Sequence, residues 1–166
     1  NGRPLAIVHR DVSPDNIFIT YSGQVKLVDF GIAKALSTRE LTRPGVVMGK
    51  TYYRAPEQIR GQAVDRRVDI WALGISFYTM VTGARPFDGP FEDDVLRAIL
   101  EDEPVPPSRH RPGLPEAIER IILRAIAKRP ADRYSTAGAM RVEIEEAMLK
   151  STPVSSYQLA AFMEQL

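Results

Sequence analysis

Two short apolar runs near the start of the chain have the length and composition of β-strands. Residues 17–20 and 25–29 are rich in Ile, Val and Phe, and Tyr-Ser-Gly-Gln separates them. A Ser-Gly pair between two such runs predicts a β-hairpin. The hairpin would put Asn16 at the start of one strand and Asp29 at the end of the other. Both side chains are therefore expected to face the same site.

A polar loop precedes the hairpin and follows another apolar run, residues 5–8. The loop carries Asp11 and Asn16, five positions apart. Flanking strands would fix the ends of the loop, which suits a segment that carries functional side chains. An Asp can accept a proton from a hydroxyl, and the carbonyl oxygen of an Asn can bind a hard cation such as Mg²⁺.

The longest apolar segment predicts a helix over residues 65–82, with Asp65 as its N-cap and Gly83 just past its end. Apolar residues cover nearly every face, which is typical of a buried central helix. Asp69 interrupts this pattern. Either it is buried and paired with donors, or it is an exposed residue that the helix dipole favours in the first turn.

Helical patterns continue toward the C-terminus. They predict a helix over 91–103, a helix from Pro115 through Ile126, and a helix from Ser135 or Thr136 to about Lys150. Residues 32–54 read as a long loop. The fold class expected is mainly α with a small β-hairpin.

Composition narrows the function classes. The chain has 166 residues, a net charge of +1 and no cysteine. A nearly neutral domain has no strong field for nucleic acid, so no nucleic-acid partner is expected. No apolar stretch is long enough to span a bilayer.

Four motifs occur in a fixed order: H-R-D-x-x-x-x-N at 9–16, D-F-G at 29–31, A-P-E at 55–57 and D-I-W-A-L-G at 69–74. With these motifs the chain is identified as a member of the protein kinase family. Residues 1–150 resemble its C-terminal lobe, an α+β unit.

That family's N-terminal lobe is absent from this sequence, which holds neither its Gly-rich loop nor its strand Lys. The resemblance therefore implies a partial catalytic domain, inactive as an isolated fragment, that requires the missing N-lobe for activity. Residues 151–166 read as a linker and the start of an amphipathic helix, which is expected to pack on its own lobe.

The resemblance implies a function and cofactors. Asp11 would orient the substrate hydroxyl and take its proton, while Asn16 and Asp29 would hold Mg²⁺ on the phosphates of ATP. Phe18 and Val28 match the floor of the adenine pocket, although core packing would explain them equally well.

Further positions match structural roles in the family. His9 and Phe30 correspond to residues that stack to join the lobes, and His9 is given no role in proton transfer. Gly31 completes the D-F-G motif.

The family pairs the residues that correspond to Glu57 and Arg133, and two separate surface charges are the alternative. The residue that corresponds to Asp69 accepts hydrogen bonds from the catalytic-loop backbone in the family.

Three positions depart from the family pattern. Ser13 stands where the Ser/Thr branch has Lys, and Lys50 stands where it has the Thr that follows Gly. We interpret these two as one exchange, in which Lys50 supplies the phosphate-facing charge near Asp11 and Ser13; a solvent-facing Lys50 is the alternative. Val46 replaces the usual phosphorylated Thr.

Activation-loop control is expected from Arg10, since Arg beside the catalytic Asp marks kinases whose activation loop a phosphate can order. With Val46 at the usual acceptor position, Thr42 is the first candidate for that phosphate, followed by Thr38 or Ser37.

Two function classes remain open at this point. The first is an ATP- and Mg²⁺-dependent protein serine/threonine kinase of the eukaryotic-like bacterial type, acting on a protein substrate. The second is a pseudokinase or regulatory lobe that binds partners, for which Ser13 is the main argument. A small-molecule kinase of the aminoglycoside type is a distant third, because such enzymes lack A-P-E. The location expected is cytoplasmic, including the cytoplasmic part of a membrane-anchored receptor kinase.

Overall fold

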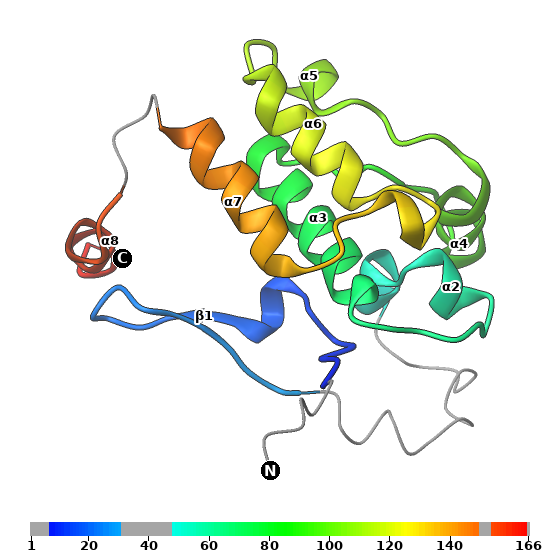
Figure 1. The fold of residues 1–166 in the computed structure, drawn as a ribbon, viewed down its shortest axis with the longest axis horizontal. Coiled ribbons are helices and arrows are strands. Elements are labelled where there is room, and N and C mark those ends of the chain that lie inside the picture. The colour runs from blue at the N-terminus through cyan, green and yellow to red at the C-terminus, as the bar shows by residue number, and fades with distance from the viewer. Residues whose placement is uncertain (1–6, 31–47, 150–153, 166) are drawn as a thin grey trace.

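A helical body and a β-hairpin make up the part of the chain that is described by the computed structural model, residues 7–30, 48–149 and 154–165. Helix α3, Arg67–Thr82, runs through the middle of the body. It packs against α6, Glu116–Ala125, and α6 packs against α7, Ala137–Met148 (Figure 1). The predicted fold class, mainly α with a small hairpin, is confirmed.

The hairpin forms where the apolar runs predicted it. Strand β1, Ile17–Ile19, pairs antiparallel with β2, Val25–Leu27. Gly23 has φ 73° and donates its N–H to the carbonyl of Thr20 at 2.8 Å, which closes the turn. Glycine enters this left-handed conformation without a Cβ penalty. A short 3-10 turn, η1 (Pro14–Asn16), leads directly into β1.

Helix α3 ends as predicted, but its start differs. The helix begins at Arg67 and its N-cap residue is Arg66, so the prediction of Asp65 as the N-cap is wrong, although Asp65 Oδ1 accepts the N–H of Arg67 at 2.8 Å. At the other end Gly83 has φ 70° and donates to Thr79 O at 2.8 Å.

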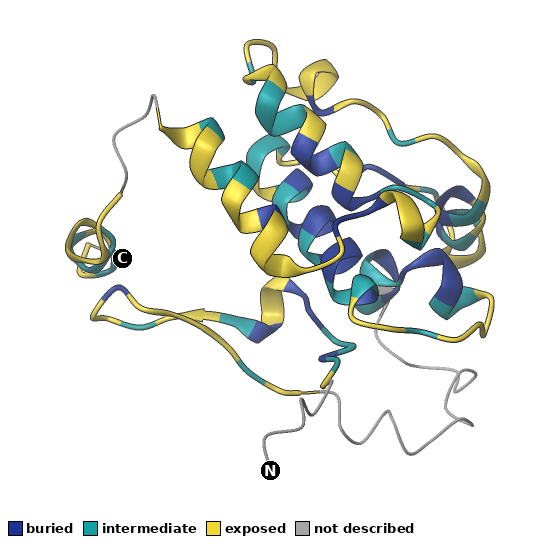
Figure 2. Ribbon diagram, in the orientation of Figure 1, coloured by how far each residue is buried: buried dark blue, intermediate teal, exposed yellow. Residues whose placement is uncertain are grey.

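Burial of α3 is less complete than its composition predicted. Trp71 and Tyr78 are fully buried, but Met80 is 77% exposed. The expectation of a helix buried on all sides is wrong at this end, because α6, the 3-10 segment η2 (Met48–Tyr53) and α5 (Pro107–His110) cover only part of its circumference (Figure 2).

Of the remaining elements, α4 (Glu92–Glu101) and α8 (Ser156–Met163) were predicted, with shifted ends. The sequence patterns did not predict the short helices α2 (Pro56–Ile59) and α5, nor the 3-10 segments η1, η2 and η3 (Pro130–Asp132). Of these, η2 lies within the segment that was expected to be a loop.

The structure identifies the N-cap of helix α7 and the residues that the C-terminal helices bury. Thr136 Oγ1 accepts the N–H of Ala139 at 3.1 Å, so Thr136 and not Ser135 caps α7. Met140 is buried, whereas Met148 at the end of the same helix is 40% exposed. Helix α8 touches the hairpin turn at Gly23 and has no buried residue. No helix among the described residues has both the length and the apolar character needed to cross a membrane.

Candidate active site

Asp69 anchors the loop that precedes the hairpin to the first turn of α3. Its Oδ2 accepts the main-chain N–H of His9 and its Oδ1 accepts that of Arg10, both at 2.8 Å. Arg10 has φ 64°, a left-handed conformation that non-glycine residues rarely adopt and that needs support from its surroundings. Asp69 is therefore paired with loop donors, and the alternative of a solvent-exposed first-turn carboxylate is wrong.

His9 joins the same loop to the hairpin. Its ring is buried, Nε2 lies 3.0 Å from Val28 O, and Nδ1 accepts the N–H of Asp11 at 3.4 Å. A carbonyl can only accept, so the ring proton belongs on Nε2. The ring also packs 4.7 Å from that of Phe30, tilted by 42°. Both nitrogens are thus occupied by structural hydrogen bonds.

Asp11 and Asn16 meet at the end of the loop. Asn16 is buried, and its Nδ2 donates to the main-chain oxygen of Asp11 at 2.6 Å and to Asp11 Oδ2 at 3.3 Å. The Asp11 side chain is 14% exposed. The main-chain oxygen of Asn16 accepts the N–H of Val28 at 2.9 Å, which ties this pair to the hairpin.

Asp29 follows Val28 at the end of the hairpin and is exposed. Its φ is 57°, the second left-handed non-glycine residue among the described ones. The Asn16 amide turns its nitrogen to Asp11, so its oxygen is the atom suited to a cation. No group of three or more His, Cys, Asp or Glu in the described ranges could hold a metal ion. One amide oxygen and one carboxylate nevertheless fit Mg²⁺, which commonly takes one or two protein ligands and completes its shell with phosphate and water.

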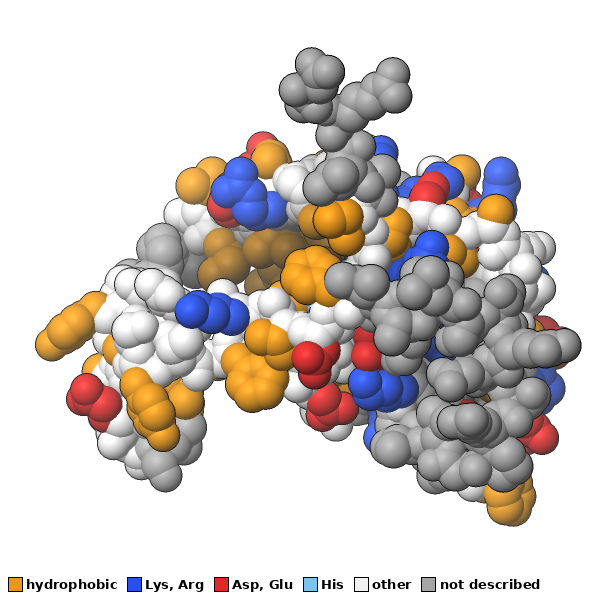
Figure 3. Space-filling model, turned by 90° about the horizontal axis from the view of Figure 1, so that it is seen from below, with side chains coloured by type: hydrophobic (Ala, Val, Ile, Leu, Met, Phe, Trp, Pro, Cys, Tyr) orange, Lys and Arg blue, Asp and Glu red, His pale blue; other side chains and the backbone are white. Residues whose placement is uncertain are grey.

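Hydrophobic side chains are exposed on the side of the molecule that carries the hairpin (Figure 3). Phe18 is 55% exposed, Phe30 is 53% exposed, and Val28 is half-buried. Core packing therefore does not account for Phe18. Its place in the floor of an adenine pocket stays a prediction.

Lys50 reaches the catalytic loop from η2. Its Nζ donates to Asp11 Oδ2 at 2.8 Å, so this side chain does not simply point to solvent. Ser13 is buried, and its Oγ has no hydrogen-bond partner among the described residues. The ammonium thus contacts Asp11, as the exchange interpretation expected, but makes no hydrogen bond to Ser13.

Residues after Lys50 hold η2 in place through contacts that the sequence did not reveal. Buried Thr51 donates its hydroxyl to Glu92 in the first turn of α4. The guanidinium of Arg85 lies 3.7 Å from the centre of the Tyr52 ring, a cation–π contact. Burial raises the pKa of the neighbouring Tyr53. An acidic residue at a helix start is common, so nothing in the sequence links Glu92 with Thr51.

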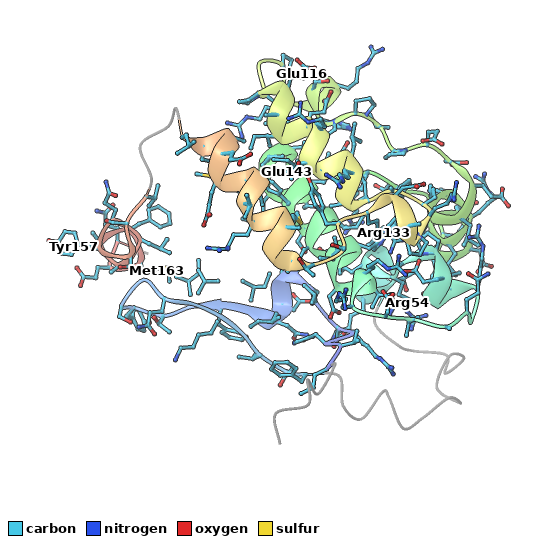
Figure 4. The ribbon with its side chains drawn as sticks, in the orientation of Figure 1. Arg54, Glu116, Arg133, Glu143, Tyr157 and Met163 are labelled. Carbon is cyan, nitrogen blue, oxygen red and sulfur yellow. The ribbon has the colours of Figure 1, made fainter. Side chains whose placement is uncertain are left out.

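Arg133, labelled in Figure 4, follows the η3 segment and forms a buried ion pair with Glu57 of α2. The pairing expected from the resemblance is present, and the alternative of two separate surface charges is wrong. Two predicted positions, Gly31 and Thr42, lie outside the described residues, as do Ser37, Thr38 and Val46.

Comparison with known proteins agrees with this geometry. The model of the family "Protein kinase domain" matches residues 4–144. The chain is similar to the tyrosine-protein kinase MasK of Myxococcus xanthus, with 54% identity over 144 residues, 87% of this chain and 22% of that protein. It is 43% identical to the serine/threonine-protein kinase PrkC of Bacillus subtilis over 141 residues, 85% of this chain and 22% of PrkC.

A third relative is the serine/threonine-protein kinase PknB of Mycobacterium tuberculosis, 41% identical over 140 residues, 83% of this chain and 22% of PknB. The chain thus spans about a fifth of the length of the curated relatives it matches. Because the family model covers most of the chain, the chain belongs to the protein kinase family, in its eukaryotic-like branch with bacterial relatives.

Proposed function

We propose that the protein transfers the γ-phosphoryl group of ATP to serine or threonine hydroxyls of protein substrates. The observation that carries this proposal is the geometry of Asp11 and Asn16, a largely buried carboxylate within 3.3 Å of an amide that is suited to a cation. Phosphoryl transfer depends on positioning and on charge neutralisation, and a loop fixed by Asp69 and His9 supplies the positioning.

Each site residue has a distinct part in this proposal. Asp11 orients the substrate hydroxyl and accepts its proton. Asn16 and Asp29 hold Mg²⁺, which neutralises phosphate charge when it is bound. Phe18 and Val28 support the adenine ring, and residues 1–150 form the C-terminal lobe of the catalytic domain. Asp11, Asn16 and Asp29 are all retained, which favours an enzyme over a binding module.

The acceptor residue is the finer part of the proposal. PrkC and PknB are named serine/threonine kinases, whereas MasK, at 54% identity, is named a tyrosine kinase. Tyrosine is therefore the second candidate acceptor. Serine or threonine is preferred because Pro14 and Asn16 follow Asp11 at the spacing of the Ser/Thr pattern.

Phosphoamino-acid analysis tests both parts. The full-length protein is incubated with radiolabelled ATP, Mg²⁺ and a generic basic protein, alongside an Asp11→Asn control. We expect label on phosphoserine or phosphothreonine only in the wild type. Label confined to phosphotyrosine would overturn the acceptor assignment, and equal label in the control would overturn phosphoryl transfer through Asp11.

A further inference from the structure

The ammonium of Lys50 lies inside the catalytic constellation although it comes from a different loop. It contacts Asp11 Oδ2 at 2.8 Å, and the same oxygen lies 3.3 Å from Asn16 Nδ2. Asp11 Oδ2 thus accepts from two donors: Lys50, 39 residues away in sequence, and Asn16, 5 residues away. Any hydroxyl that approaches Asp11 as its base would also lie close to this positive charge.

Burial makes this contact different from an ordinary surface ion pair. The side chains of Lys50 and Asp11 are 36% and 14% exposed, whereas those of the Arg141–Glu145 pair on α7 are 70% and 59% exposed. Exposed pairs contribute little because water and salt screen them. A cation near a shielded carboxylate acts on its neighbours more strongly.

Contacts of the next two residues, Thr51 and Tyr52, hold the backbone that carries Lys50 in place. The hydroxyl of Thr51 bonds to Glu92 of α4, and Arg85 covers the ring of Tyr52. A flexible Lys side chain can then reach the site from a rigid base. Such support is what a charge needs if it is to act at one defined place.

We propose that Lys50 is a catalytic residue whose ammonium neutralises the phosphoryl group in transfer. This inference rests on the proposed phosphoryl transfer. In that step the substrate oxygen bonds to the γ-phosphorus and its proton passes to Asp11. The bond from the γ-phosphorus to the bridging oxygen breaks, and its electron pair leaves with ADP. Lys50 keeps its protons throughout and acts by charge alone.

Kinetics of the full-length enzyme test this assignment with three variants. Lys50→Met removes the charge and keeps the length, Lys50→Arg keeps the charge, and Arg141→Met removes a cation from the exposed pair as a control. We expect Lys50→Met to lower kcat by roughly 10²- to 10³-fold, the loss typical of one charge-stabilising donor, with KM for ATP within about threefold. Lys50→Arg should keep at least about a tenth of kcat, and Arg141→Met should match the wild type.

The pH dependence separates catalysis from mere positioning of Asp11. If Lys50 only kept Asp11 ionised, the rate of Lys50→Met would return at higher pH, where the carboxyl ionises unaided. We expect the loss to persist from about pH 6 to pH 9. Recovery at high pH, a kcat of Lys50→Met within threefold of wild type, or an equal loss in Lys50→Arg would each overturn the proposal.

Asp11→Asn, assayed in parallel, shows which claim has failed. If Asp11→Asn abolishes transfer and Lys50→Met does not change it, the inference about Lys50 is wrong and the proposed function stands. If Asp11→Asn itself transfers phosphate at the wild-type rate, the proposed function is wrong.

Discussion

Arg133 and Glu57, 76 residues apart in sequence, form a bidentate ion pair with N–O distances of 2.7 and 2.8 Å in the interior of the protein. The other N–H groups of the guanidinium donate to main-chain oxygens of Ala127, Arg67 and Lys128. All five guanidinium N–H groups are thus satisfied. The pair ties the segment after η2 to the helical body.

Breaking this pair should destabilise the fold strongly. In Glu57→Gln the buried guanidinium loses its counter-charge, and in Arg133→Ala the carboxylate is left alone. We expect each to lower the free energy of unfolding by about 3–5 kcal/mol, measured by urea denaturation. Arg133→Lys should not rescue it, because an ammonium cannot reproduce the planar fork. A loss below about 1 kcal/mol in both variants would contradict this role.

Asp69→Asn should impair both folding and catalysis. The amide has one acceptor oxygen where the carboxylate has two, so either His9 or Arg10 loses its main-chain partner. We expect about 1–3 kcal/mol of destabilisation and a kcat lower by roughly tenfold in the full-length enzyme. Asp65→Asn is the matched control, because it makes the same change at an exposed carboxylate near the start of the same helix and leaves the partners of His9 and Arg10 intact. Equal kcat values for the two variants would refute a positioning role for Asp69.

The titration of Lys128 makes the free energy of unfolding depend on pH. Burial lowers the pKa of Lys128 from 10.5 to about 8, while its Nζ donates to Ala98 O and Ile99 O at the end of α4. Between those pH values the unfolded chain binds more protons than the folded one, so this group favours folding increasingly as pH rises.

The prediction is a difference between wild type and Lys128→Met. The free energy of unfolding of the wild type, relative to the variant, should increase from about pH 7 to pH 9.5 and be lowest at the acid end. Chemical denaturation at several pH values measures it. A difference that falls with rising pH would show that Lys128 keeps its proton more tightly in the folded state.

The 166-residue chain alone is predicted not to transfer phosphate. It holds no Gly-rich loop and no strand Lys for the phosphates of ATP, and its hydrophobic face at Phe18 is open. Incubation with radiolabelled ATP, Mg²⁺ and a basic protein should give no more label than the Asp11→Asn chain. Clear activity above that control would contradict the prediction.

Local patterns predicted the parts of the fold that depend on neighbouring residues. The hairpin, the Gly83 end of α3 and the Thr136 cap of α7 all arise from interactions within a few positions. The exposure of Met80 and Met148 did not follow, because it depends on which elements cover each face. Helix α5 is a single turn, too short for a periodic pattern.

Some contacts of the candidate site were likewise predicted from the sequence, and others were not. The resemblance to the protein kinase family predicted that Asp69 would bind the backbone of the loop that carries Asp11 and Asn16. The departures at Ser13 and Lys50 suggested that Lys50 lies near Asp11. The Thr51–Glu92 bond joins residues 41 positions apart and has no sequence signal. The supporting contacts of η2 therefore became visible only in the folded arrangement.

The most direct test of the central claim is the single-turnover rate of phosphoryl transfer by full-length Asp11→Asn, with ATP affinity measured in the same preparation. The account predicts that ATP binds within a few-fold of wild type, since Asn16 and Asp29 are intact, and that the transfer rate falls by roughly 10²-fold or more. A transfer rate close to wild type, with ATP bound, would contradict it.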